Sequence, residues 1–325
     1  MAITYCIHSP ADKSALAVKL QGNASHQGFT LIELSIVLVI IGLIVGGVLV
    51  GQNLIAAGEV RAQITQIEKY NTAANTFRGK YGYLPGDIPN PTAGQFGFVQ
   101  RGAVAGEGDG NGILQAVSSA ACNNTGCLSG TFEGAGEVVM FWVDLSTIGL
   151  IDGGFNTATP ATIPSADITG TNINLYLPQA KIGRGNYVYV WSSTYWSAGT
   201  GFVSLGVNYF GLSAANNIPA SSNQGKMTST ANIPVAQAYA IDTKIDDGMP
   251  QSGNVMAWFL NGDQKWVDGT NACCTLNEPL PTTTAITGSS TTCYDNGHVA
   301  NATQNYSMEI NSGAGANCAL SFKMQ

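Results

Sequence analysis

One carboxylate stands at the border of a long apolar run near the start of the chain. Residues 34–58 carry no charged side chain, and Glu33 comes directly before them. A charge placed inside a membrane costs roughly 2.5–3.5 kcal/mol or more unless it finds a partner. An ionisable residue in such a segment is therefore a candidate functional site, and its simplest chemistry is an ion pair with a cationic amine. The alternative is an ordinary signal anchor in which Glu33 has no role.

A second set of candidate residues lies in a glycine-rich acidic loop. Glu107, Asp109 and Asn111 alternate with glycines over residues 107–112, as in the first half of a calcium-binding loop. Such a loop needs a bidentate glutamate at its twelfth position, where this chain has Ser118. A carboxylate from elsewhere in the chain would have to complete the coordination shell. The alternative is a flexible glycine loop that binds no metal.

A third set, Asp242, Asp246 and Asp247, gathers at the predicted C-terminal end of a helix. The helix dipole repels anions at this end, and Asp242 and Asp246 also repel each other at a separation of four residues. Bound Ca²⁺ would relieve this repulsion. The alternative is structural, with Lys244 or backbone N–H groups of the following Asp-Gly turn compensating the charge. No cofactor is required, and Ca²⁺ is the one candidate ion.

The residues around Glu33 resemble a known kind of N-terminus. A polar segment ends at Gly28, and Phe29 opens the stretch that leads through Glu33 into the apolar run. This pattern resembles the class III leader and N-terminal methylation motif of type IV prepilins and pseudopilins. An ordinary secretory signal peptide fits badly, because its apolar region has only about 7–15 residues and precedes the cleavage site.

The resemblance implies a route of processing and assembly. A membrane-bound prepilin peptidase would cut between Gly28 and Phe29 on the cytoplasmic side and methylate the new amine of Phe29. Glu33 would then pair with the terminal amine of a neighbouring subunit as the helices pack into a filament. The implied partners are copies of this chain or other pilins, the peptidase and methylase, and an inner-membrane assembly platform. The leader departs from the family in one respect, since His26 and Gln27 stand where Lys or Arg is usual.

The implied function is that of a structural subunit of a type IV pilus-like filament, or fimbrium. A pseudopilin of a type II secretion system is the alternative, because both use residues 28–58 in the same way. Before assembly the chain would sit in the bacterial inner membrane with its C-terminal domain outside the cytoplasm. Afterwards it would belong to a cell-surface pilus or a periplasmic pseudopilus. The large, weakly charged domain favours exposure outside the cell.

Six cysteines follow the leader, and an even number in an exported chain predicts disulfides. Cys122 and Cys127 enclose a short run of turn residues, so we expect them to bond each other. The remaining four allow three connectivities, and adjacent cysteines rarely bond each other. We therefore expect Cys273 and Cys274 each to bond Cys293 or Cys318. A zinc site is the alternative, but His298 does not complete a ligand pattern of the usual spacing.

Composition argues against several classes of function. Charged residues make up 10% of the chain, the net charge is −7, and no basic cluster suits nucleic acid. Beyond the leader, His298 is the single histidine, and no glycine-rich phosphate loop with a lysine occurs. We therefore expect no catalytic site. A membrane-anchored exported enzyme is the remote alternative.

One long helix and one α+β domain must position these residues. After a leader at residues 1–28, residues 29–80 form a predicted helix, with about 29–53 crossing the membrane or forming the filament core and 54–80 amphipathic. Residues 81–325 form a predicted globular α+β domain in which the helix packs on an antiparallel sheet, with C-terminal loops stapled by disulfides. Its further predicted elements are helices at 133–148 and 234–246, and strands at 186–192, 202–210 and 254–260.

Overall fold

The computed structural model describes residues 29–102, 104, 106–117, 132–197, 201–220, 226–267, 287–299 and 302–325. The chain divides into two compact units, Met1–Gly51 and Gln52–Gln325. Helix α1 (Leu31–Tyr81) is continuous through both units, as the sequence predicts. Each unit is described by itself.

In the first unit the described residues are the start of α1 and the two residues before it. Every side chain from Phe29 to Val50 is exposed, including the apolar run from Leu34 to Val50. The glycines at positions 42, 46 and 47 do not interrupt the helix, and a Cβ at any of them would meet nothing within 4 Å. The helix is long and apolar enough to cross a membrane by length and composition.

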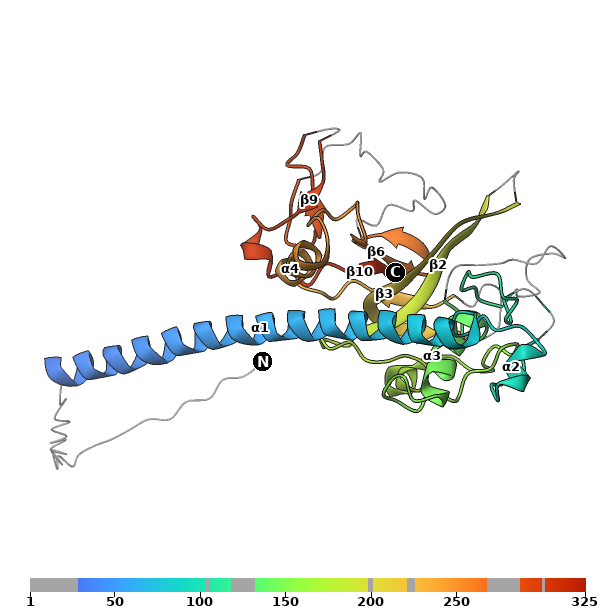
Figure 1. The fold of residues 1–325 in the computed structure, drawn as a ribbon. Coiled ribbons are helices and arrows are strands. Elements are labelled where there is room, and N and C mark those ends of the chain that lie inside the picture. Colours follow the sequence, from blue (N-terminus) through green and yellow to red (C-terminus); the bar gives the residue numbers. More distant parts are fainter. Residues whose placement is uncertain are drawn as a thin grey trace, which may run out of the picture. The chain divides into compact units, whose positions relative to one another are not determined.

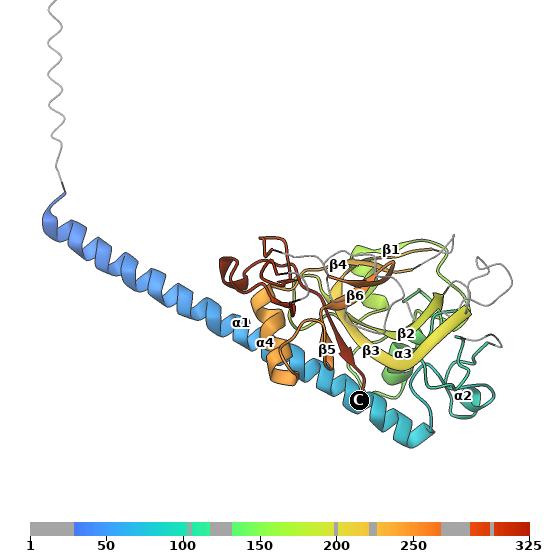
Figure 2. The ribbon, with the colours of Figure 1, turned by 90° about the horizontal axis from the view of Figure 1, so that it is seen from above.

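In the second unit the remainder of α1 is amphipathic. Its buried face includes Val60, Ile67 and Phe77, which confirms the predicted helical stripe. Tyr70 on the same face packs its ring 5.0 Å from Trp142 in α3 (Glu137–Thr147) and 6.2 Å from Phe210 in β3 (Gly201–Ile218). Figures 1 and 2 show this part of α1 running beside α3 and β3. The α1 helix ends at Tyr81, where Gly82 takes a positive φ of 82° that stops helical propagation.

Six antiparallel strands form the main sheet around β3 (Gly201–Ile218). The strands paired directly with β3 are β1 (Ile168–Thr169), β2 (Tyr187–Ser197), β4 (Thr228–Thr230) and β10 (Leu320–Lys323). The sixth strand, β5 (Val255–Met256), pairs with β10. The α+β class with a long N-terminal helix and an antiparallel sheet is confirmed.

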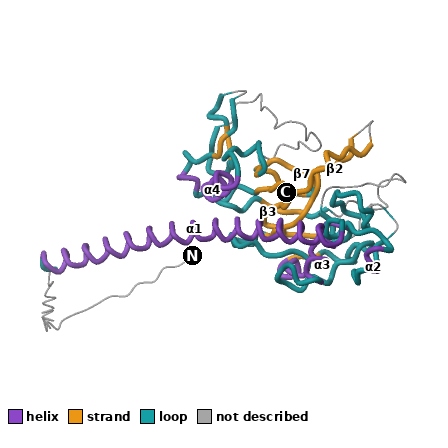
Figure 3. The backbone as a smooth tube through the Cα atoms, in the orientation of Figure 1, coloured by secondary structure: helices purple, strands orange, loops and turns teal. Residues whose placement is uncertain are grey.

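The other described elements are short and are joined by long loops (Figure 3). They are α2 (Thr92–Gln95), η1 (Gly170–Leu175), α4 (Val235–Ile245), the hairpin of β6 (Trp258–Asn261) with β7 (Asp263–Trp266), the pair β8 (Tyr294–Asp295) and β9 (Asn305–Tyr306), and η2 (Asn311–Gly313).

Several predicted elements differ from the structure in their bounds: β2 and β3 extend to Ser197 and Ile218, beyond the predicted strand ends at 192 and 210. Helix α3 begins at Glu137 rather than at 133, because Gly136 has a φ of 89° and backbone of this kind cannot continue a helix. The predicted strand at 254–260 is split into β5 and β6. Ala257 lies between them, and its N–H donates to the carbonyl of Pro250 in a loop instead of to a strand.

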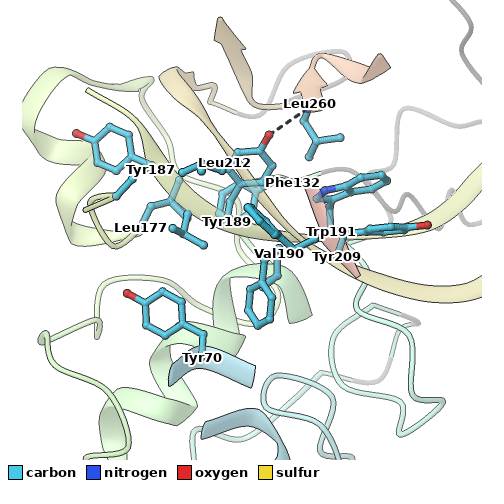
Figure 4. Close-up of a cluster of buried hydrophobic side chains, with 14 of the residues drawn as sticks. Tyr70, Phe132, Leu177, Tyr187, Tyr189, Val190, Trp191, Tyr209, Leu212 and Leu260 are labelled. Carbon is cyan, nitrogen blue, oxygen red and sulfur yellow. Dashed lines mark hydrogen bonds between the residues drawn. The ribbon is translucent and has the colours of Figure 1, made fainter. Parts of the chain in front are cut away.

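The core of the second unit gathers aromatic side chains from β2, β3 and their neighbours (Figure 4). The Tyr189 hydroxyl accepts a hydrogen bond from the Leu260 N–H at 3.1 Å and also bonds the Ser213 hydroxyl at 3.0 Å. Its ring lies over Gly211, the residue opposite it in β3. This arrangement satisfies a buried hydroxyl while filling the space above a glycine.

Candidate functional site

The start of α1 is closed by a reciprocal capping box. The Glu33 carboxylate accepts hydrogen bonds from the Thr30 N–H at 2.8 Å and the Thr30 hydroxyl at 2.7 Å. The Glu33 N–H in turn donates to the Thr30 hydroxyl at 3.3 Å. A Thr-x-x-Glu sequence forms this motif because each side chain satisfies a backbone group at the helix N-terminus. In a single copy of the chain, Glu33 therefore has a local partner.

The proposed processing site lies at the edge of the described residues. Gly28 is outside them, and Phe29 is 87% exposed. Phe29 lies two residues before α1 begins at Leu31 and four residues before Glu33, so the cleavage site and Glu33 are close in the chain. Exposure of Phe29 is compatible with access by a peptidase.

The glycine-rich loop at 106–112 contributes to a three-carboxylate cluster. Carboxylate oxygens of Asp87, Asp109 and Glu137 all lie within 4.8 Å of one another. Of the three predicted ligands, Asp109 belongs to this cluster and the Asn111 amide bonds its carboxylate at 2.9 Å. Glu107 is not among the three: its carboxylate accepts from the Val104 N–H at 3.1 Å.

Backbone N–H groups of the loop surround two of these carboxylates. Asp87 accepts from Gly110 and Gly112, both at 2.8 Å, and Glu137 accepts from Gly108 at 3.0 Å. The three glycines have φ between 75° and 107°, a region that L side chains rarely adopt, so the alternating glycines allow the loop to turn its N–H groups inward. The glycine pattern thus has a structural role that requires no ion.

Burial dominates the electrostatics of this cluster. It raises the pKa of Asp87 to about 6 and raises the pKa of Glu137 well above its usual range, with Asp109 adding repulsion in both cases. Sequence reasoning missed Asp87 and Glu137 because they are far from the loop in the chain and no local spacing marks them. The cluster has the oxygen donors that Ca²⁺ prefers, but the N–H groups compete for the same oxygens.

The second acidic cluster is formed as the sequence predicts. Asp242, Asp246 and Asp247 bring carboxylate oxygens within 4.8 Å of one another at the C-terminal end of α4. Buried Asp242 accepts from the Tyr306 hydroxyl at 2.8 Å and from the Gly248 N–H at 3.1 Å. Burial raises the pKa of Asp242 to about 7.

The neighbouring backbone compensates the other two carboxylates. Asp246 accepts from the Val255 N–H at 3.2 Å, and Asp247 accepts from the Met249 N–H at 2.8 Å and the Ser252 hydroxyl at 2.7 Å. Such hydrogen bonds from backbone N–H groups of the turn after Asp247 are the structural alternative to a bound ion that the sequence suggests. These bonds anchor the loop to α4 and β5, and the residues retain the chemistry to hold a cation.

The C-terminal region contains a disulfide between Cys293 and Cys318, whose Cα atoms are 5.0 Å apart. The prediction that each would bond Cys273 or Cys274 is wrong. Cys318 lies just before β10, and Cys293 lies just before β8, so the sheet and the β8–β9 pair bring these two cysteines together. Cys122, Cys127, Cys273 and Cys274 lie outside the described residues. His298 is exposed and its Nδ1 bonds the Thr287 hydroxyl at 2.7 Å, so no metal set forms around it in the described part of the chain.

Comparison with protein families matches residues 23–49 to the prokaryotic N-terminal methylation motif. No curated protein and no solved structure matches the chain. The matched residues include Gly28, Phe29 and the Thr30–Glu33 capping box, together with much of the exposed apolar helix. This motif is typical of structural, pilin-type proteins. The chain therefore carries the class III leader and N-terminal methylation motif of type IV pilin-like proteins.

Proposed function

We propose that the chain is a structural subunit of a type IV pilus-like filament and polymerises through the first part of α1. The observation that carries this proposal is the match of residues 23–49 to the methylation motif, over the first part of α1, whose apolar side chains are all exposed in a single copy. An uninterrupted apolar surface of this kind requires cover by lipid or by other protein. The membrane would supply that cover before assembly, and neighbouring helices would supply it afterwards.

Glu33 gives this packing its register. Processing between Gly28 and Phe29 creates a new amine only four residues before Glu33. In the apolar interior of a filament, that amine and the Glu33 carboxylate of a neighbour would each lower the desolvation penalty of the other. Assembly thus exchanges the local bonds between Glu33 and Thr30 for an intersubunit ion pair, at least in part.

The location of the filament distinguishes the two functions that the motif allows, a pilin of a surface pilus and a pseudopilin of a secretion system. Surface fibres sheared from cells should contain the processed chain, and antibodies to the second unit should label intact cells. If the chain is confined to the periplasm and its deletion blocks export of folded cargo, it is instead a pseudopilin of a type II secretion system.

A further inference from the structure

A groove in the second unit takes no part in the proposed assembly site or in either carboxylate cluster. Its volume is about 740 Å³. One wall is the part of α1 that carries Arg61 and Lys69, and the other walls are the loop around Asp152 and the segment from η1 toward β2. Tyr70 and Leu177, both labelled in Figure 4, are buried lining residues of the groove.

Specific contacts hold the walls of the groove in place. The Gln66 side chain donates to the Gln179 carbonyl at 2.9 Å and accepts from the Lys181 N–H at 2.9 Å, which fastens the segment before β2 onto α1. Lys69 forms an ion pair with Asp152 at 2.6 Å and joins the second wall to the helix. The groove is therefore formed by the fold itself and does not need a ligand to shape it.

The groove is cationic in a chain whose net charge is −7. Its lining includes Arg61, Lys69 and Lys181, against Asp152 as the one carboxylate. The hydrogen bond and charge of Lys69 lower the pKa of Asp152, and the charge of Lys181 adds to this effect. Arg61 and Lys181 are exposed, and neither forms an ion pair with any residue that the structure describes.

The spacing of the cations suits an extended chain. Arg61 and Lys69 are eight residues apart on α1, which is about 12 Å along the helix axis. Carboxylates four residues apart on an extended peptide are separated by about 13 Å. The aromatic lining residues Tyr70 and Phe155 are buried, so they present no open ring face on which a nucleic-acid base would stack. The Asn174 amide at the rim offers hydrogen-bond donors for a peptide backbone.

We propose that this groove binds an extended acidic peptide segment of another protein, with one carboxylate near Arg61 and a second, four residues away, near Lys69 and Lys181. The proposal holds whether the chain forms a surface pilus or a periplasmic filament. It identifies the partner by chemistry alone: two acidic side chains on an otherwise neutral extended segment.

The test is fluorescence anisotropy with the full chain in detergent micelles at low ionic strength. The probe is a fluorescein-labelled peptide of nine residues with glutamates at its third and seventh positions and serine or glycine elsewhere. Arg61→Gln and Lys181→Gln should each weaken binding by about threefold or more, because each removes one charge pair. Arg78→Gln is the matched control, since Arg78 is exposed on the same helix outside the groove. It should bind as the unmodified chain does.

Four results would overturn the proposal. The first is that the peptide with glutamines in place of both glutamates binds equally well. The second is that Arg78→Gln weakens binding as much as the groove substitutions do. A single-stranded oligothymidylate that displaces the peptide and depends on Arg61 and Lys181 in the same way would assign the groove to nucleic acid instead. Added salt should weaken the glutamate peptide steeply, and binding that is insensitive to salt contradicts the ion pairs. The Arg61→Gln and Lys181→Gln proteins should melt at the temperature of the unmodified chain, since both substitutions alter exposed side chains.

Discussion

At the scale of single residues, buried carboxylates distinguish the second unit. Glu133 is 4% exposed and one of its oxygens, Oε2, has no hydrogen-bond partner among the described residues. Burial raises its pKa to about 7, and Lys226 opposes this shift only in part. Burial also raises the pKa of Asp87 and of Asp242, but backbone N–H and hydroxyl groups donate hydrogen bonds to these two carboxylates. Glu133 is therefore the simplest residue in which to measure the cost of burial.

We predict that Glu133→Gln reduces the pH dependence of stability. A carboxyl whose folded pKa is raised contributes stability that is fully present below its unfolded pKa, near 4.5, and is lost as the pH rises through about 7. The free energy of unfolding of the full chain should therefore fall by up to about 3 kcal/mol between pH 4.5 and pH 8 because of Glu133. Unfolding of the two proteins by denaturant at pH 5 and pH 8 measures the difference. An equal pH dependence in the variant would show that Glu133 does not titrate in this range.

Calcium binding by the glycine-rich loop, predicted through Glu107, Asp109 and Asn111, stays a prediction, and the structure adds Asp87 and Glu137 beside Asp109. A bound ion stabilises the folded state by an amount that grows with the logarithm of its free concentration. The melting temperature of the full chain in detergent should rise with free Ca²⁺, and Asp109→Asn should reduce that rise. Glu68→Gln, an exposed change on α1, is the control. Identical melting curves with Ca²⁺ and with chelator would leave the inward N–H groups as the sole partners of these carboxylates.

At the scale of elements, the sequence predicts the helices and strands whose apolar residues repeat regularly over many positions. The extent of α1 and the pairing of β2 with β3 follow from apolar spacing in runs of many residues. Strand β10 was missed because four residues near the chain end carry too short a pattern, and its place between β3 and β5 depends on contacts with distant segments. The capping box has a local signature, Thr30-x-x-Glu33, and could have been predicted from the sequence.

The capping box permits a separation of the two roles of Glu33. Glu33→Gln keeps a side-chain acceptor for the Thr30 N–H but removes the charge, and Thr30→Val weakens the cap but keeps the charge. If the carboxylate pairs with a neighbour's amine, Glu33→Gln should abolish most filament yield while Thr30→Val retains it. Sheared-fibre yield, with membrane levels of each variant as the control, measures this. The reverse order of yields would mean that helix capping, rather than the ion pair, is needed for assembly.

The β2–β3 pair supplies a test of the core. A Cβ at Gly211 would lie 2.1 Å from the Tyr189 ring, which itself bonds Ser213 and Leu260. Gly211→Ala should destabilise the chain by about 1–3 kcal/mol, because the ring must leave its position. Gly154→Ala is the matched control, since a Cβ there meets nothing within 4 Å and its φ is not positive. Equal denaturant midpoints for the two variants would contradict the packing of Tyr189 over Gly211.

At the scale of the whole molecule, the two units have different requirements for cover. The second unit buries its own apolar residues, whereas the apolar side chains of the first are exposed throughout its described part. The sequence anticipated this contrast because an uncharged run and an amphipathic stretch follow each other within one helix. It did not anticipate which distant carboxylates join Asp109, or that Cys293 bonds Cys318, because folding of loops sets both contacts.

The central claim is that the chain is processed and assembled as a pilin-like subunit, and the mature N-terminus tests it most directly. Mass spectrometry of the chain recovered from sheared filaments, or from a purified periplasmic filament, should identify an N-terminal peptide that begins with N-methylated Phe29. Filament-borne protein that retains residues before Phe29, or that begins at Phe29 without the methyl group, would contradict the account.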